Sequence, residues 1–227
     1  MCFSAMIAKI SGEELVKTDY LDVKEIKMIE YPSNAKAIEE DRRFFPKTWA
    51  PVLVKGREDF QLRPMRYQLL PHFCKEDKYT RKNPKTGRMV EIKNTFNARV
   101  DSLEERRAWQ PLFGARHAAV PLESFYEWVD RNGSKTLIEF RPKDEKLFWV
   151  ACLWDRWEKE GEYIDSFAMI TDEPNPEVLE KGHDRTPIVL KEEHLLDWLQ
   201  PQNETKGELY EMLEDKKPLY FEGAYLG

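Results

Sequence analysis

Cysteine is scarce in this sequence of 227 residues, which contains only three. They stand at positions 2, 74 and 152, and no two of them form a Cys-x-x-Cys pair. Paired cysteines are the usual sign of a disulfide framework or a structural zinc site, so this odd, widely spaced set argues against both. We therefore expect reduced thiols in an intracellular, cytoplasmic protein.

Other signatures are missing as well. The four histidines, at positions 72, 117, 183 and 194, show no His-Glu-x-x-His pattern, and we expect neither a metal nor a cofactor. No apolar run approaches the roughly 20 residues that span a bilayer. No basic-then-apolar segment opens the chain, so we expect no membrane span and no secretory signal.

The formal net charge of −6 weighs against a generic nucleic-acid binder, which usually has a basic surface. Binding needs only a local patch, however, and residues 75–93 supply one. This basic stretch has seven Lys or Arg residues and three acidic residues. It is either a solvated loop or a surface that faces phosphate groups.

The length suits a single domain over residues 1–227. Apolar runs and turn signals predict strands at 52–54, 116–121, 124–129, 136–140, 147–154, 164–170 and 219–221. Segment 62–71 mixes apolar residues with two Arg, and we expect it to cross the edge of the core. Asn132-Gly133 favours a type I′ hairpin, and Glu160-Gly161 marks a second turn between strands. Segment 24–29 is a strand or a short helix, and residues 31–34 form a turn.

Capping signals predict helices at 11–20, from Ser102 through Trp109, from Pro176 to Gly182, at 192–200 and at 207–216. Because hairpins join the strands without regular β-α alternation, we expect an α+β fold with antiparallel sheets and peripheral helices.

Cys2 is a special residue if Met1 is removed, because it then carries a free α-amine and a free thiol. The amine, with a pKa of about 7.7–8.0, can attack an aldehyde, and the thiol can add to the resulting imine. The two attacks close a thiazolidine ring, which no internal cysteine can form. The alternative is that Cys2 is buried or inert.

Three further positions are candidates for chemistry. Strand alternation places Glu127 on the same face as Phe125, where burial would raise the pKa of its carboxyl group toward the range useful in proton transfer. The alternative is an exposed strand glutamate. His183 lies on a loop behind Gly182, as an acid/base or simply solvated. Asn97 and Arg99 share a face, and Arg suits phosphate.

Taken in order, Met1-Cys2, Asn97-Ala98-Arg99, Phe125-Tyr126-Glu127-Trp128 and the run 183–190 resemble the SRAP (SOS response-associated peptidase) family. These proteins process abasic sites in single-stranded DNA. The resemblance runs from Cys2 to about Leu190 and implies one compact domain with β-barrel-like sheets and a basic cleft for single-stranded DNA.

The resemblance also implies roles for individual residues. Cys2 would become the mature N-terminus and form a thiazolidine with the ring-opened abasic sugar. Asn97 would orient the Cys2 end, and Arg99 would contact a DNA phosphate. Glu127 would transfer protons at the amine and the sugar, and His183 would help the sugar open to its aldehyde. We expect a monomer that joins the nucleoid during repair.

The sequence departs from the family pattern in several places. Cys2-Phe3-Ser4 replaces the usual Cys-Gly-Arg, residues 67–73 replace Trp-Gly-Leu-Ile-Pro-x-Trp, and residues 122–124 replace Ala-Asp-Gly. Since any flat ring can stack on a base, we expect His72 or Phe73 to replace the missing Trp. The predicted DNA contacts in the basic stretch are Lys82, Lys85 and Arg88.

Two other functions remain open at this point. Cys2 could attack a carbonyl in a cysteine or N-terminal-nucleophile hydrolase, with Glu127 or His183 as base. The chain could also be a non-catalytic module for single-stranded nucleic acid.

Overall fold

The computed structural model describes residues 3–8, 26–32 and 42–226. Four predictions fall wholly or partly outside these ranges, the fourth being segment 24–29, of which residues 26–29 are described. Cys2 and the predicted helix at 11–20 lie outside the described residues, and so does the second half of the predicted turn at 31–34. Within the ambiguous segment 24–29, residues Ile26–Met28 form strand β2.

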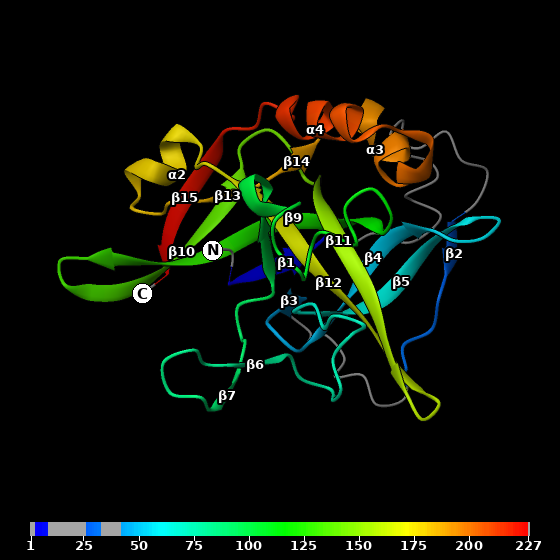
Figure 1. Cartoon of the computed structure of the whole chain (residues 1–227). Helices are drawn as coiled ribbons and strands as arrows, with labels where there is room; N and C mark the ends of the chain where they lie inside the picture. The colour runs from blue at the N-terminus through cyan, green and yellow to red at the C-terminus, as the bar shows by residue number, and fades with distance from the viewer. Residues whose placement is uncertain (1–2, 9–25, 33–41, 227) are drawn as a thin grey trace.

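Five strands close into a barrel at the centre of the described structure (Figure 1). They are β4 (Trp49–Lys55), β5 (Phe60–Tyr67), β9 (His117–Arg131), β11 (Phe148–Lys159) and β12 (Glu162–Asp172). The pairing order β11-β12-β5-β4-β9 returns to β11 through the β9–β11 pair. All these pairs are antiparallel except β12 with β5.

Strand β9 belongs both to the barrel and to the part of the same sheet that extends beyond it. Its first half pairs with β11, from His117 to Leu122. Its second half pairs with β1 (Ser4–Ile7) on one side and β10 (Ser134–Pro142) on the other. Sequence patterns predicted two strands here, but the chain stays extended through residues 122–124, because these residues pair across to β1 and β11.

The hairpin turns follow their sequence signals. Asn132 and Gly133 have φ angles of 55° and 79°, and Glu160 and Gly161 have φ angles of 54° and 85°. Positive φ at both central residues is the mark of the type I′ turn, whose twist matches that of the flanking strands. The prediction of a type I′ turn at Asn132-Gly133 is confirmed.

The remaining strands are short and lie around the barrel. They are β3 (Arg43–Phe44), β6 (Thr80–Lys82), β7 (Met89–Glu91), β8 (Asn97–Arg99), β13 (Thr186–Pro187), β14 (Val189–Leu190) and β15 (Phe221–Leu226). Strand β8 runs parallel to β12, and β2 runs parallel to β5. The antiparallel expectation therefore holds for most pairs but not for all.

The described part of the chain has three short α-helices, α2 (Pro176–Glu180), α3 (Glu192–Trp198) and α4 (Lys206–Glu214). Thr205 and Glu208 form the predicted capping box of α4, with both reciprocal hydrogen bonds present. Figure 1 shows α3 and α4 along the top of the barrel, so the peripheral placement agrees with the predicted α+β class, although strands dominate. Among the described residues, none of the helices combines the length and the apolar character that crossing a membrane requires.

The helix predicted from Ser102 through Trp109 is wrong. A 3-10 turn at Val100–Ser102 leads instead into a run of successive turns that reaches residue 115. The Ser102 hydroxyl donates to the Arg99 carbonyl and does not cap a helix. Burial of Leu103, Trp109 and Phe113 in the core determines this path, because their spacing does not fit one face of a straight helix.

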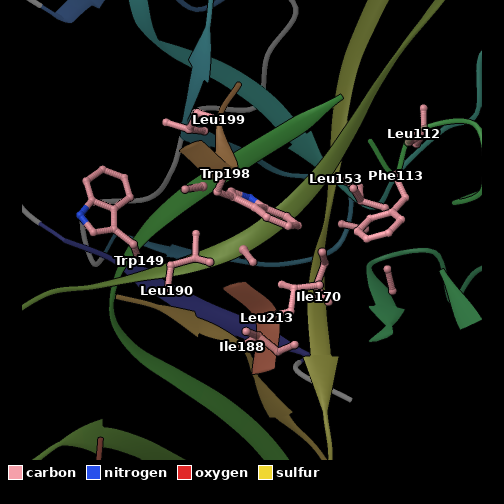
Figure 2. Close-up of a cluster of buried hydrophobic side chains, with 14 of the residues drawn as sticks. Leu112, Phe113, Trp149, Leu153, Ile170, Ile188, Leu190, Trp198, Leu199 and Leu213 are labelled. Carbon is pink, nitrogen blue, oxygen red and sulfur yellow. The ribbon is translucent and has the colours of Figure 1, made fainter. Parts of the chain in front are cut away.

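The core has two parts. One fills the barrel with aromatic residues such as Phe44, Tyr67 and Phe167. The other lies between the barrel and the C-terminal helices, and Figure 2 shows Trp198 of α3 amid its side chains. The Trp198 indole donates to the Ala118 carbonyl on β9 over 2.9 Å, so the helix is fixed in register as well as packed.

The neutral imidazole ring of His117 connects β9 to helix α3. It is 2% exposed, lies 3.8 Å from the Trp198 ring centre and stacks on Phe113. Its Nδ1 contacts the Trp198 carbonyl at 3.1 Å, and its Nε2 accepts the Gly114 N–H at 2.9 Å. Burial lowers the pKa of His117 to about 3.

This burial predicts a specific acid sensitivity. The unfolded pKa of His117 is 6.5, so stability from the neutral ring is complete above that pH and is lost as pH falls toward the folded pKa of about 3. From pH 6.5 to 4.5 the loss from this residue is roughly 2 kcal/mol. His117→Gln should be less stable at pH 7.5, but its deficit in urea unfolding should shrink at pH 4.5. A deficit that is equal at both pH values would contradict this assignment.

Candidate functional site

Glu127 on β9 and His183 on the loop after α2 form a buried acid–base pair. His183 Nε2 lies 3.1 Å from Glu127 Oε2. The two residues are only 2% and 7% exposed, so the alternatives of an exposed glutamate and a solvated histidine are both excluded. Trp128 turns the other way and is 46% exposed, as strand alternation requires.

The hydrogen bonds of His183 hold its ring against Glu127. His183 Nδ1 lies 2.9 Å from the Arg185 carbonyl oxygen and 3.3 Å from the Arg185 amide nitrogen, so it donates to the first or accepts from the second according to the tautomer. Nε2 either donates to a Glu127 carboxylate or accepts from a Glu127 carboxylic acid. Burial raises the pKa of Glu127, and the His183 hydrogen bond partly opposes this by lowering it. Such a pair can pass a proton in either direction.

The loop that carries His183 is fixed by the end of α2. Gly182 adopts a φ of 91°, a left-handed conformation that reverses the chain with no Cβ penalty. The His183 amide then donates back to the Val178 carbonyl over 3.2 Å. Helix α2 is itself tied to β15, since the Phe221 amide donates to Glu177 Oε1 over 2.8 Å. The predicted helix stop at Gly182 therefore places the histidine.

A second feature is a cleft of about 400 Å³ at the edge of β8. Asn97, which is buried, and Arg99, which is exposed, both line it, as expected for two residues on one face. The cleft is also lined by Tyr79, Trp109 and three further cations, Arg81, Arg106 and Arg107. Aromatic rings beside several arginines are typical of surfaces that bind single-stranded nucleic acid.

Arg99 and Arg185 approach the same carboxylate, that of Asp101. Arg99 Nε donates to Asp101 Oδ1 over 3.1 Å, and Arg185 NH2 lies 4.0 Å from Asp101 Oδ2. The Arg99 hydrogen bond lowers the pKa of Asp101, so this carboxyl group stays ionised. Because Arg185 directly follows the His183 loop, Asp101 links the cleft to the Glu127–His183 pair.

The two aromatic residues predicted to stack on DNA bases, Phe73 and His72, lie beside the cleft. The Phe73 ring meets Tyr79 edge-on with centroids 5.7 Å apart, and the Arg107 guanidinium lies 4.2 Å from its centre. His72 is exposed, but its Nδ1 is bound to the buried Asp155 carboxylate at 2.8 Å. Phe73 is thus adjacent to lining residues, whereas His72 is oriented by the barrel.

The basic stretch forms the exposed hairpin β6–β7, which projects from the barrel in Figure 1. Lys82, Lys85 and Arg88 are all exposed on it. Gly87 has a φ of 68°, as its turn position predicted. The base of the hairpin supplies Tyr79, Arg81 and Ile92 to the cleft, so the hairpin and the cleft form one surface.

Sequence reasoning did not select Arg81, Arg106 or Arg107 as candidates. Arg106 and Arg107 were hidden inside the predicted helix that the structure replaces with turns. The sequence signal for these residues is the adjacent pair Arg106-Arg107, a few residues after Arg99. This signal can be interpreted only when the turns are known to bring the pair back to β8.

The chain ahead of Asn97 is held by a strained residue. Gln68 is 7% exposed and has a φ of 90°, a region that favours glycine. Its side chain donates to the Lys93 carbonyl over 3.0 Å, and Thr95 Oγ1 donates to the Leu69 carbonyl over 2.8 Å. These bonds pin the residues just before Asn97 to the end of β5.

The N-terminal strand β1 begins near the Glu127 end of its pairing with β9 and runs away from it. It runs antiparallel to β9, and Ser4 lies opposite Tyr126, the residue before Glu127. Cys2 lies outside the described residues, so the predicted nucleophile has no observed geometry. The described part of the site therefore begins at Phe3.

A family model described as SOS response associated peptidase (SRAP) matches residues 1–222. This chain belongs to the SRAP family. The abasic site processing protein YoqW of Bacillus subtilis is 31% identical over 166 residues, covering 72% of this chain and 68% of YoqW. YobE of the same organism is 31% identical over 165 residues, covering 71% of this chain and 69% of YobE.

The fold of this chain is also seen in solved structures. A crystal structure of a protein from Bordetella bronchiseptica matches this chain with a TM-score of 0.72 and covers 100% of both chains. Its sequence identity is 19%, so this likeness establishes the fold and nothing more.

One group of potential metal ligands exists in the described part of this SRAP chain, formed by Glu193, His194 and Asp215. Its carboxylates already have partners. Lys191 Nζ lies 2.6 Å from Asp215 Oδ1, and His194 Nε2 lies 2.9 Å from Asp215 Oδ2. A cation would compete with the lysine for the same oxygens, so the donor set fits a surface ion-pair network better than a metal.

The buried pair predicts a pH-dependent cost for losing its imidazole. His183→Phe should destabilise the protein by about 3–5 kcal/mol at pH 8, because the Glu127 carboxylate then stays buried without its imidazole partner. The folded pKa of Glu127 is raised, so this cost should shrink as pH falls through that pKa and the carboxyl group takes up a proton. Urea unfolding at pH 8 and pH 5 measures it. A cost that is constant with pH would show that the pair is not an ionic contact.

Proposed function

We propose that this SRAP protein processes abasic sites by binding single-stranded DNA and forming a covalent thiazolidine through Cys2 after Met1 is removed. The relatives YoqW and YobE are named abasic site processing proteins. The observation that supports the chemistry is the buried Glu127–His183 pair beside the start of β1. An abasic sugar is mostly a closed hemiacetal, and a proton-transferring pair is what opens it.

Chain connectivity limits how far Cys2 can lie from the start of β1. Consecutive Cα atoms are about 3.8 Å apart, so the Cα of residue 2 lies within roughly 7.6 Å of the Cα of Ser4. Ser4 is opposite Tyr126, and Glu127 follows Tyr126 on the same strand. A short peptide tether to a fixed strand gives the high effective concentration that a two-step covalent reaction needs.

The other thiols are poorly suited to the reaction. Burial raises the pKa of Cys74 to about 11, and it raises the pKa of the fully buried Cys152 as well. The thiolate is the reactive form of cysteine, so both residues are inert near neutral pH. Among the three cysteines, Cys2 is thus the candidate nucleophile.

The proposed reaction balances without a cofactor. The pair opens the sugar by moving a proton from the C1 hydroxyl to the ring oxygen, which exposes the aldehyde. The Cys2 amine adds to C1, and the hydroxyl group of the resulting carbinolamine leaves as water with a proton from the pair, while the nitrogen returns a proton to the pair, which gives an imine. The thiol then adds to the same carbon while its proton passes to nitrogen, which closes the ring. The net change is the loss of one water.

The positions of the surrounding residues are compatible with the following roles. Glu127 can take the ammonium proton of Cys2, and His183 can return a proton to the departing hydroxyl group. Asn97 is buried beside the cleft, where an amide can hold the chain end. Arg99 and the other cleft arginines suit backbone phosphates, and Phe73 suits a base.

A crosslinking assay with an abasic single-stranded oligonucleotide tests the function. Cys2→Ser should give no lasting adduct, because its oxygen ring is far less persistent than a thiazolidine. Glu127→Gln, which keeps the shape of the side chain, should slow adduct formation by roughly 10²–10⁴-fold, the usual contribution of a general acid or base. Denaturing gels measure both. Undiminished adduct in Cys2→Ser would contradict the proposal.

The alternative function, a hydrolase, would use the same Glu127–His183 pair. The two functions differ in the electrophile that Cys2 attacks. An aldehyde gives a lasting adduct, whereas an ester or amide substrate would turn over. Repeated turnover of an ester, with no adduct on abasic DNA, would favour the hydrolase. The family description as a peptidase is compatible with release of Met1 by this same site.

The basic hairpin predicts a salt effect. Each phosphate contact on single-stranded DNA contributes about 0.7 to the slope of log affinity against log salt. Changing Lys82, Lys85 and Arg88 together to Gln should therefore reduce that slope by up to about 2. Fluorescence anisotropy with an undamaged oligonucleotide measures it. The control triple Lys135→Gln, Lys143→Gln and Lys159→Gln removes the same charge from exposed sites elsewhere. An equal effect in the control would exclude the hairpin as a specific contact.

A further inference from the structure

One arginine joins the beginning of β1 to the strand that carries Glu127. Arg43 lies on β3, which pairs with β1 so that Arg43 is opposite Met6. Its guanidinium donates to Ser4 Oγ from Nε over 3.1 Å and from NH2 over 2.9 Å. Its Cζ also lies 3.9 Å from the centre of the Tyr126 ring. A single side chain thus contacts both members of the Ser4–Tyr126 pair.

The Tyr126 ring is a fixed platform for this guanidinium. Tyr126 is 3% exposed, and its hydroxyl donates to Glu139 Oε1 over 2.9 Å on the neighbouring strand. Glu139 in turn accepts from Arg141 over 2.8 Å. Phe45 lies on a second side, with its ring centre 4.9 Å from Arg43 Cζ. Packing and hydrogen bonds therefore leave Arg43 little freedom.

The far end of β1 is held by the preceding residue. Arg42 NH1 donates to the Ile7 carbonyl over 2.9 Å, and Arg42 forms two hydrogen bonds with the Glu123 carboxylate on β9. Neighbouring side chains in regular extended chain point in opposite directions. Arg42 has a φ of 60°, which breaks that alternation and lets both guanidinium groups reach β1. Strain of this kind persists only where the surrounding contacts enforce it.

We propose that Arg43 is a positioning residue for the reaction of Cys2. Ser4 is two residues after Cys2, and Tyr126 is one residue before Glu127. By fixing Ser4 against Tyr126, Arg43 sets how the chain end approaches the acid–base pair. The inference rests on the proposed function and adds a residue to it. In this role Arg43 acts through Ser4.

The geometry favours this role over direct contact with DNA. The residues that line the 400 Å³ cleft do not include Arg43. One edge of its guanidinium faces Ser4, and Tyr126 lies against its plane. Both the amine and the thiol of residue 2 must reach the same carbon, and a misplacement of about 1 Å can cost roughly 100-fold in rate. A fixed anchor next to Cys2 would therefore affect the rate more than the affinity.

The test compares Arg43→Ala, Ser4→Ala and the double variant in the full-length protein. Two quantities are measured, the first-order rate of adduct formation at saturating abasic oligonucleotide and the Kd for the undamaged oligonucleotide. We expect Arg43→Ala to lower the rate by about 10-fold or more while Kd changes less than about 2-fold. Ser4→Ala should lower the rate less and should add nothing in the Arg43→Ala background.

A matched control removes a similar contact elsewhere on β9. Arg131 lies 4.2 Å from the Tyr225 ring centre, at the other end of the strand. Arg131→Ala should leave rate and Kd unchanged. Arg43→Lys, which keeps the charge and can donate to Ser4, should recover part of the rate even if Arg43→Ala folds poorly.

Several outcomes would overturn the proposal. They are an unchanged rate in Arg43→Ala, a Kd that rises in step with the loss of rate, or additive effects of the two single variants. If the wild-type protein forms no adduct, the proposed function itself fails. Amide hydrogen exchange at residues 4–6 still tests the anchor in that case, with faster exchange in Arg43→Ala supporting it and unchanged exchange overturning it.

Discussion

The hydrogen-bonded contact between Glu127 and His183 is possible only because a strand and a loop from distant parts of the chain are both held rigidly. Two ionisable groups in a nearly dry site cost free energy unless they are paired. The barrel provides one side of this contact through β9, and α2 with its Gly182 stop provides the other. Much of the surrounding structure can be understood as support for this pair.

Strand β9 links the support to the site. Its first half belongs to the barrel, and its second half carries Glu127 between β1 and β10. The cleft lies on a different edge, where β8 runs beside β12. Asp101 connects the two regions through Arg99 and Arg185. The cleft and the Glu127–His183 pair are thereby linked by charged side chains although they are built from separate elements.

Local signals in the sequence predicted the parts of the fold that local physics determines. Asn132-Gly133 and the Thr205–Glu208 capping box specify their own geometry, and both formed as expected. The failure at residues 102–109 has the opposite cause. Ser102 and Glu105 match a capping box, but the burial of Leu103 and Trp109 bends the chain into successive turns. Tertiary packing outweighed the local preference there.

The site could be predicted as a set of residues but not as an arrangement. Glu127 and His183 were candidates separately, yet no spacing rule could bring them to 3.1 Å. Arg81 and Arg107 reach the cleft only through the hairpin and the turns. Arg43 carried no sequence signal, because its importance depends on the register of β1 against β9. Such contacts follow from strand pairing, which the sequence pattern leaves undetermined.

The most direct test of this account is an intact mass spectrum of the protein mixed with an abasic single-stranded oligonucleotide. The account predicts a protein that lacks Met1 and a new species whose mass equals protein plus DNA minus one water. Peptide mapping should place the DNA on Cys2. A protein that retains Met1, or an adduct on any other residue, would contradict the thiazolidine mechanism.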